Sequence, residues 1–414
     1  MYIQMKEHQR LLLAAAAVIA AALFLLRNPG GGPQLVSVQR LSDYGDVCPP
    51  VEPIVYASSQ EGGQTGDVTR APTRTIRDTY PIYTAVAVDT NFDEVVLMDN
   101  NNWSLRVYNR LDNTAAGAEF TPPKRVIEGP ETDIQFNNGL YIDPKNGDIY
   151  SVETDTGDKV VVFPRDANGN VKPARILATP HRGFSLAVDE EKQELYVGVQ
   201  YPPEVAVYRK SASGKEKPLR SLKGESTRLS DVHGIAIDPK NKLLFVNNWG
   251  HVSDYRIAGT GRFEEPSIAV YPLGADGDTA PLRVIQGSRT QLNWAAQMAI
   301  DTDTGDIYVA NDIGHSVLVF KGTDQGNVAP GRVIKGDRTG LLNPSGVFVD
   351  SKHKELWVSN FGNHSSVVYP LNANGNVRPL RTIRSAPAGK KSLKFGKVEA
   401  VVYDSKRDEL LVPN

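Results

Sequence analysis

Pro330-Gly331-Arg332-Val333-Ile334 is one of seven copies of a Pro-x-Arg-x-(Ile/Leu) run in this sequence. The other copies begin at Pro72, Pro123, Pro173, Pro218, Pro281 and Pro379. Proline is tolerated in a sheet only at the first residue of a strand or on an edge, so the run predicts the outermost strand, D, of a repeated sheet. A pattern that recurs along 414 residues indicates one repeat architecture rather than unrelated domains.

A second run, small and apolar and ending in Asp, precedes each D strand. Residues 234–238 are one copy, and the seven copies end at Asp89, Asp143, Asp189, Asp238, Asp301, Asp350 and Asp404. Its nearly continuous apolar character predicts an innermost strand, A, that is buried on both faces. The Asp then opens a tight turn, in which its carboxylate accepts backbone N–H groups. Strands B and C follow, as at 307–311 and 316–320.

The two ends of the chain complete each other. The last repeat has strand A ending at Asp404 and strand B at 410–414, and its strands C and D are missing. Matching segments stand at 53–56 and 72–76. An open ring would leave two unpaired sheet edges, which a blade composed from both termini removes. We therefore predict an all-β, seven-bladed β-propeller of four-stranded blades over residues 53–414, with the N- and C-termini sharing the closing blade.

The N-terminal 27 residues have the character of a membrane segment. Lys6 and Arg10 precede sixteen apolar residues, 11–26. A helix of that length spans about 24 Å, which is short for a bilayer core of about 30 Å and long for the apolar part of a signal peptide. No small-residue cleavage site follows Leu26, which favours an uncleaved transmembrane anchor over a cleaved signal. Positive charge before the helix then predicts a cell-membrane protein with its propeller on the periplasmic or extracellular side, or a secreted protein after cleavage.

Composition excludes several classes of protein. Residues 28–52, which begin with a Gly- and Pro-rich stretch, predict a flexible linker. A formal net charge of -2 argues against a nucleic-acid partner. Cys48 is the only cysteine, so an intrachain disulfide, a Cys-rich zinc site and covalently attached haem are excluded. Cys48 is either a free thiol or one half of an interchain disulfide.

The repeat resembles that of NHL-repeat β-propellers of the bacterial secreted or membrane-anchored type. The resemblance rests on segments such as 139–143, 307–311 and 362–367 and covers residues 53–414. It implies a propeller that binds proteins or other ligands. Six-bladed relatives include gluconolactonase-like hydrolases and peptidyl-hydroxyglycine lyases, and seven blades depart from that pattern.

A residue that is present in every blade serves the blade, whereas a single functional site must break the symmetry. The seven D-strand arginines are therefore predicted to be structural. His315 and His364 stand where the NHL pattern often has His before strand C, which favours a structural role over metal binding. The Asn-Gly turns at 166–170 and 372–376 predict hairpins between C and D rather than calcium loops, because they have too few carboxylates.

Symmetry is broken where the D–A and B–C loops meet. Five residues before each anchor Asp, the blades present Thr84, Asn138, Phe184, His233, Ala296, Ser345 and Glu399. Five of the seven B strands end in Asn and one ends in Val199, and Glu153 is the charged exception. Glu153, His233 and Glu399 are candidates for a divalent-metal site or for acid and base catalysis. The alternative is a polar, water-filled channel.

The fourth blade carries the largest insertion, in its B–C loop. Trp249, His251, Asp254, Tyr255 and Arg256 have the composition of a protein-binding anchor. With Asn138, they are the candidate binding residues, and a merely tolerated surface insertion is the alternative.

These patterns favour a membrane-tethered, noncatalytic binding or scaffold propeller with a protein partner and no cofactor. The alternative is a metal-dependent hydrolase or lyase, gluconolactonase-like, with its site at the mouth of the central channel.

Overall fold

The computed structural model describes most of the predicted propeller. The described residues are Ile76 and 83–99, 102–118, 120–154, 156–254, 256–351, 353–363, 365–383, 401–404, 406–407 and 409–411. The predicted anchor (1–27), the linker (28–52) with Cys48, and the expected strands at 53–56 and 72–75 lie outside them. Within the described residues there is no helix with the length and hydrophobicity needed to cross a bilayer.

The innermost strand of every blade is an A strand that ends at or next to the anchor Asp. These strands are β1 (Tyr83–Asp89), β5 (Asn137–Ile142), β9 (Gly183–Asp189), β13 (Val232–Asp238), β19 (Ala295–Asp301), β23 (Pro344–Asp350) and β27 (Val402–Asp404). The B strands that pair with them antiparallel are β2 (Glu94–Asp99), β6 (Ile149–Glu153), β10 (Glu194–Val199), β14 (Leu243–Asn248), β20 (Asp306–Asn311), β24 (Glu355–Asn360) and β28 (Glu409–Leu411).

Two further strands complete each of blades 1 to 6. The C strands are β3 (Ser104–Asn109), β7 (Lys159–Phe163), β11 (Glu204–Arg209), β17 (Ser267–Pro272), β21 (Ser316–Lys321) and β25 (Ser365–Pro370). The outer D strands are β4 (Arg125–Ile127), β8 (Arg175–Ala178), β12 (Arg220–Leu222), β18 (Arg283–Gln286), β22 (Arg332–Lys335) and β26 (Arg381–Ile383). The strand order A-B-C-D in all six sheets confirms that the Pro-x-Arg run leads into the edge strand.

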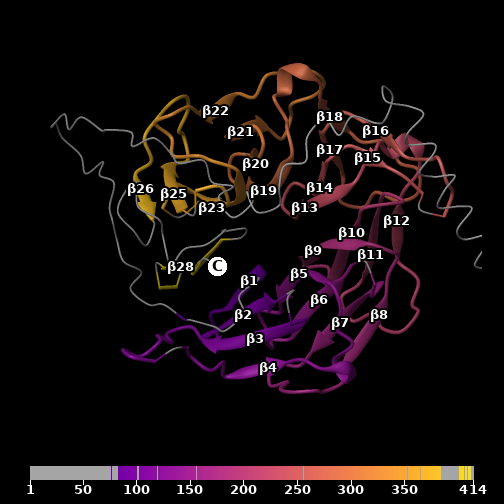
Figure 1. Cartoon of the computed structure of the whole chain (residues 1–414). Coiled ribbons are helices and arrows are strands. Elements are labelled where there is room, and N and C mark those ends of the chain that lie inside the picture. Colours follow the sequence, from indigo (N-terminus) through magenta and orange to yellow (C-terminus); the bar gives the residue numbers. More distant parts are fainter. Residues whose placement is uncertain are drawn as a thin grey trace, which may run out of the picture. The chain divides into compact units, whose positions relative to one another are not determined.

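The A strands form a closed ring (Figure 1). Each contacts the A strand of the next blade, and β27 contacts both β23 and β1. The two-stranded sheet β27–β28 therefore occupies the seventh place, between blades 6 and 1, and we call it blade 7. The all-β propeller is confirmed, with six four-stranded blades and blade 7 among the described residues.

The hydrophobic core lies between neighbouring blades. One cluster joins Tyr196 and Val207 of blade 3 to Val246 and Tyr271 of blade 4, and further clusters join each other pair of consecutive blades from blade 1 to blade 7. Strands B and C are buried almost throughout, whereas the middle residues of the A strands are half-buried. The prediction that A strands are buried on both faces is wrong, because they line the centre of the ring and have no further layer inside them.

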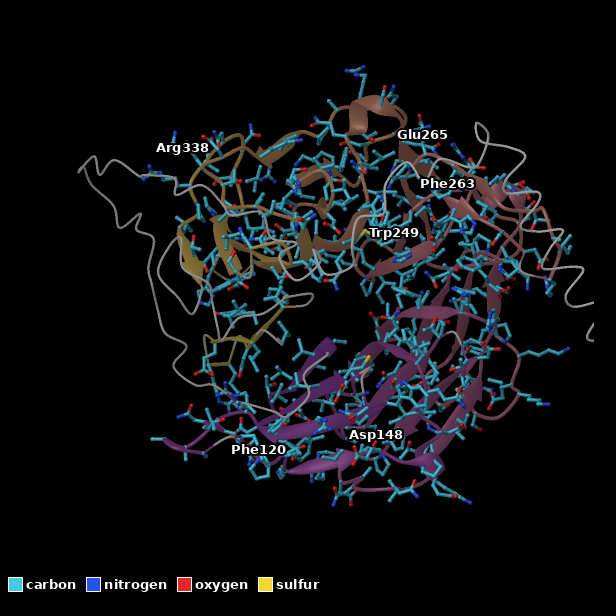
Figure 2. The ribbon with its side chains drawn as sticks, viewed as in Figure 1. Phe120, Asp148, Trp249, Phe263, Glu265 and Arg338 are labelled. Carbon is cyan, nitrogen blue, oxygen red and sulfur yellow. The ribbon has the colours of Figure 1, made fainter. Side chains whose placement is uncertain are left out.

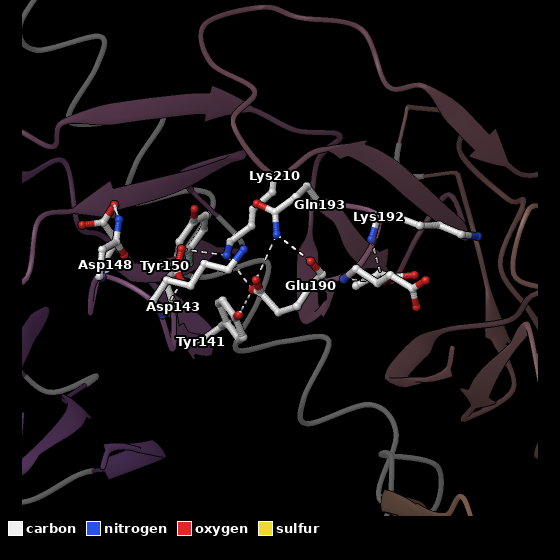
Figure 3. A network of polar contacts seen from close by, with 12 residues as sticks. Tyr141, Asp143, Asp148, Tyr150, Glu190, Lys192, Gln193 and Lys210 are labelled. Atoms are coloured by element: carbon white, nitrogen blue, oxygen red, sulfur yellow. Dashed lines mark hydrogen bonds and ion pairs between the residues drawn. The ribbon is translucent and has the colours of Figure 1, made fainter. Parts of the chain in front are cut away.

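The anchor Asp residues cap the A–B turns as predicted. In blade 3, for example, Asp189 Oδ1 accepts the backbone N–H groups of Glu191 and Lys192, each at 3.0 Å. In two interfaces the Asp also pairs with a cation that follows strand C of the next blade. Lys210 of blade 3 lies 2.7 Å from Asp143 of blade 2 and also pairs with Glu190 (Figure 3).

Arg110 repeats this inter-blade contact at the closure of the ring. Its Nε lies 3.0 Å from Asp404 Oδ2 of blade 7, and its guanidinium also pairs with Glu409. The side chains of Arg110 and Asp404 are buried. Blade 7 thus holds blade 1 in the way that blade 2 holds blade 3.

The Asn-Gly turns join strands C and D and also fasten each blade to the one before it. Asn168 Oδ1 accepts the N–H of Val126 at 3.1 Å, and Asn170 Oδ1 accepts that of Glu131 at 2.7 Å, both from blade 1 and its following loop. Glu131 lies in a single 3-10 turn, and such turns recur at Pro130–Thr132 (η2), Glu225–Thr227 (η3) and Ser288–Thr290 (η4). The side-chain oxygens that suggested calcium loops are bound to backbone N–H groups.

D-strand arginines are bound to the scaffold, as predicted. Arg125 makes two hydrogen bonds to Glu94, of 2.8 and 2.7 Å. Arg220 pairs with Glu194 in the same way, and Arg332 with Asp306. In these three blades the acid stands at the start of strand B, so the pair ties the outer strand across its own sheet.

Candidate functional site

One hydrogen bond is repeated at the end of the ring where the D–A and B–C loops meet, which we call the mouth. The residue after strand B donates its backbone N–H to the carbonyl of the residue just before strand A. The five described pairs are Thr154 to Phe136, Gln200 to Arg182, Trp249 to Asp231, Asp312 to Trp294 and Phe361 to Asn343, at 2.8 to 3.1 Å. Because the backbone is the same in five blades, the changing side chains are not required by the scaffold.

In blades 3 to 6, the residue whose carbonyl accepts this hydrogen bond has a left-handed backbone conformation. The φ angles are 67° for Arg182, 48° for Asp231, 51° for Trp294 and 47° for Asn343. This region is unfavourable for bulky residues, and such strain collects at functional sites. Trp294 is also half-exposed, at 51%. Neither backbone preference nor burial accounts for a tryptophan at this position.

Four rings form a row across blades 3, 4 and 5. The ring centroids of Phe184 and His233 are 4.4 Å apart, those of His233 and Trp249 3.5 Å, and those of Trp249 and Trp294 4.9 Å. His233 and Trp249 are stacked with an interplanar angle of 2°. Trp249 Nε1 donates to the carbonyl of Ala295 at 2.7 Å, which fixes the indole against the neighbouring blade.

A pocket of about 220 Å³ opens beside this row. It is lined by Asp231, Trp249, His251, Phe263 and Trp294, and we call it the Trp249 pocket. His251 and Phe263 come from a hairpin in the inserted B–C loop, formed by β15 (His251–Val252) and β16 (Arg262–Phe263). Trp249 lies nearer the centre of the ring than Phe263 does (Figure 2). Phe263 is 85% exposed, so its ring is available to a ligand.

Asp231 is the carboxylate of the pocket. The Gln200 amide nitrogen donates to Asp231 Oδ1 at 3.1 Å, and His233 Nε2 lies 3.2 Å from the same oxygen. The amide nitrogen also lies 3.0 Å from His233 Nε2. Neighbouring residues thus fix Asp231, which can accept a proton from water or face a cation.

Glu153 has a scaffold role that the sequence analysis did not foresee. It is fully buried at the end of β6, where it accepts the N–H of Gln135 at 2.7 Å and the hydroxyl of Ser151 at 3.0 Å. Asn248, the equivalent residue of blade 4, accepts the N–H of Ser230 in the same way. Burial raises the pKa of Glu153 to about 7, against the hydrogen bonds that lower it. A carboxylate oxygen has replaced an amide oxygen without changing the contact.

Of the three residues proposed as a catalytic or metal-binding group, the structure describes Glu153 and His233, which have different surroundings. Glu153 contacts the loop of blade 2, whereas His233 lies between Phe184 and Trp249. Glu399 lies outside the described residues. Across the part of the chain that the structure describes, no three His, Cys, Asp or Glu side chains are grouped so as to hold a metal ion. His315 Nδ1 accepts the N–H of Asn343, and His364 is not described.

The predicted binding residues of the insertion divide into two groups. Trp249 and His251 line the pocket. Asp254 and Arg256 pair with each other at 2.8 Å and do not line it. Asn138 is half-buried on β5 in blade 2, outside the pocket lining, and Tyr255 is not described.

Asp231, Phe263 and Trp294 are the pocket residues that the sequence analysis missed. Asp231 and Trp294 stand seven residues before the anchor Asp of their blades. The sequence comparison was made five residues before the anchor, whereas both residues stand two positions earlier, just before strand A. Extending that comparison by two positions would have found both. Nothing in the sequence placed Phe263 against His251.

The fold and this mouth define a β-propeller with an aromatic, acid-containing pocket at one end of its ring. The model of the family described as "Lactonase, 7-bladed beta-propeller" matches residues 116–408. The match extends over more than half of the sequence, so the chain belongs to this family. No curated protein matches it. The NHL resemblance stays a prediction, while the propeller and its seven-bladed family are established by the match.

Proposed function

We propose that the protein is a hydrolase that opens a lactone, a cyclic ester, in the Trp249 pocket. The observation that supports this best is the fixed carboxylate of Asp231 among aromatic side chains, in a chain of the lactonase family. The aromatic faces bind the ring of the substrate. Asp231 is the only carboxylate that lines the pocket among the described residues.

In the proposed reaction Asp231 acts as general base. It takes a proton from a water molecule whose oxygen attacks the ring carbonyl carbon, and the ring C–O bond then breaks. The departing alkoxide takes up the proton from Asp231, so lactone and water become a hydroxy acid and the carboxylate is regenerated. Gln200 and His233 are positioning residues, since they contact Asp231 and do not line the pocket.

The test is hydrolysis of a panel of five- and six-membered lactones, followed by proton release. Asp231→Asn is expected to lower kcat by about 10²- to 10⁴-fold, the usual contribution of a general base. The matched control is Asp158→Asn, because Asp158 also pairs with a histidine, His181, at 2.7 Å, outside the pocket lining. Absence of lactone hydrolysis by the wild-type protein, or full activity of Asp231→Asn, would contradict the proposal.

The second candidate is the noncatalytic binding of a protein partner through the hairpin. Ile257 and Phe263 are 58% and 85% exposed on this insertion, and large exposed apolar side chains often mark partner sites. If deletion of residues 252–262 removed a co-purifying membrane or periplasmic protein while lactones were never hydrolysed, this function would replace the first. Membrane tethering through residues 1–27 remains a prediction under either function.

A further inference from the structure

The lining of the Trp249 pocket contains one carboxylate, that of Asp231. Among the described residues that line it there is no Lys or Arg, and Asp231 is the only acid. Two arginines of the loops at the mouth, Arg182 and Arg262, have partners of their own. Arg182 lies over the ring of Tyr201, with its guanidinium carbon 4.5 Å from the centroid, and Arg262 lies 3.1 Å from Glu225 and 3.0 Å from Glu264.

The pocket walls are faces and edges of aromatic rings. Trp249 and Trp294 are tilted by 35° to each other, which opens a wedge between their planes. Phe263 and His251, with centroids 5.6 Å apart, form the hairpin side. Aromatic faces attract cations through their quadrupole, tryptophan most strongly, and cages of aromatic rings are a common means of binding alkylammonium groups.

The rings are not explained by packing. Trp294 is half-exposed in a backbone conformation that disfavours it, and Phe263 is almost wholly exposed. A neutral ligand would use the same rings but would gain no charge–charge attraction from Asp231. An anionic ligand would be repelled by that carboxylate.

We propose that the Trp249 pocket recognises a positively charged alkylammonium group, so that the substrate is a lactone bearing such a group. As a statement about the substrate, this rests on the proposed hydrolysis. As a binding preference, it is independent of catalysis and is measured separately.

The binding test uses two molecules of the same shape and different charge, choline and 3,3-dimethyl-1-butanol. Titration of the wild-type protein, followed by calorimetry, is expected to give at least about tenfold tighter binding of choline. Trp294→Leu keeps the apolar volume but removes the π face, and is expected to abolish this preference. Trp294→Phe is expected to retain part of it. The control is Trp103→Leu, at an exposed tryptophan of blade 1 that also has positive φ.

Equal binding of the two molecules, or a preference for the neutral one, would overturn the inference. A parallel assay compares α-amino-γ-butyrolactone, γ-butyrolactone and γ-carboxy-γ-butyrolactone, which share one ring and differ in charge. Hydrolysis that favours the amino compound supports the substrate class. Hydrolysis without charge preference refutes the substrate class and leaves the lactonase proposal standing. Choline binding with no hydrolysis of any lactone refutes the lactonase proposal and leaves the cation site standing.

Discussion

The two ends of the ring differ in which features repeat from blade to blade. At the end that holds the A–B turns, which we call the turn end, side chains repeat from blade to blade, as the anchor Asp residues and the pair of cations Arg110 and Lys210 show. At the mouth the backbone hydrogen bond repeats but the side chains change. Repetition therefore marks what holds the blades together. We propose that variation on a constant backbone marks the ligand site.

A substitution at the turn end, where blade 7 meets blade 1, should have the largest effect on the free energy of unfolding. Arg110→Leu removes one of the two cations that pair with the buried Asp404, since Arg407 also lies 3.2 Å from it, so the cost should be at the low end of that for a broken buried ion pair, about 3 kcal/mol. We expect the free energy of unfolding in urea to fall by that amount. Arg209→Leu removes an exposed pair with Glu216 and should cost less than about 1 kcal/mol. Equal unfolding midpoints for the two variants would show that Arg110 does not close the ring.

Two buried glutamates, one at each end, should respond to pH in opposite directions. Burial raises the pKa of Glu153 at the mouth to about 7. For Glu94 at the turn end burial acts the same way, but hydrogen bonds from Arg125 and Lys124 outweigh it and lower the pKa to about 2. Glu153 therefore lowers stability as the pH rises from about 4.5 to about 7, whereas Glu94 adds stability above pH 4.5 that is lost as the pH falls toward 2.

The glutamine variants measure these contributions. At pH 8 we expect Glu153→Gln to raise the free energy of unfolding by about 1–3 kcal/mol, and Glu94→Gln to lower it by about 1–3 kcal/mol. Near pH 4 the gain from Glu153→Gln should disappear, because the wild-type carboxyl is then protonated in both states. Urea unfolding across this pH range checks both signs. A pH-independent difference for Glu153→Gln would show that its carboxyl does not titrate within that interval.

How much of the structure the sequence could predict also depends on which features recur from blade to blade. The anchor Asp residues and the Pro-x-Arg run recur with their strands, so the blades, the capped turns and the structural arginines followed from the pattern. Glu153 was misjudged because its different residue type suggested a different role, although an acceptor oxygen is all that the position requires. The row from Phe184 to Trp294 joins three blades through contacts between loops, and no spacing within one repeat records them.

The smallest effect on stability should come from the mouth, at Trp294. Asn343 occupies the equivalent position in blade 6 with nearly the same φ, and asparagine tolerates this conformation better than tryptophan does. Trp294→Asn should therefore leave the free energy of unfolding unchanged or raise it by up to about 1 kcal/mol, while choline binding is lost. A fall of more than about 1 kcal/mol in urea unfolding would show that Trp294 belongs to the scaffold. The presence of tryptophan at this position would then be explained by stability and not by ligand binding.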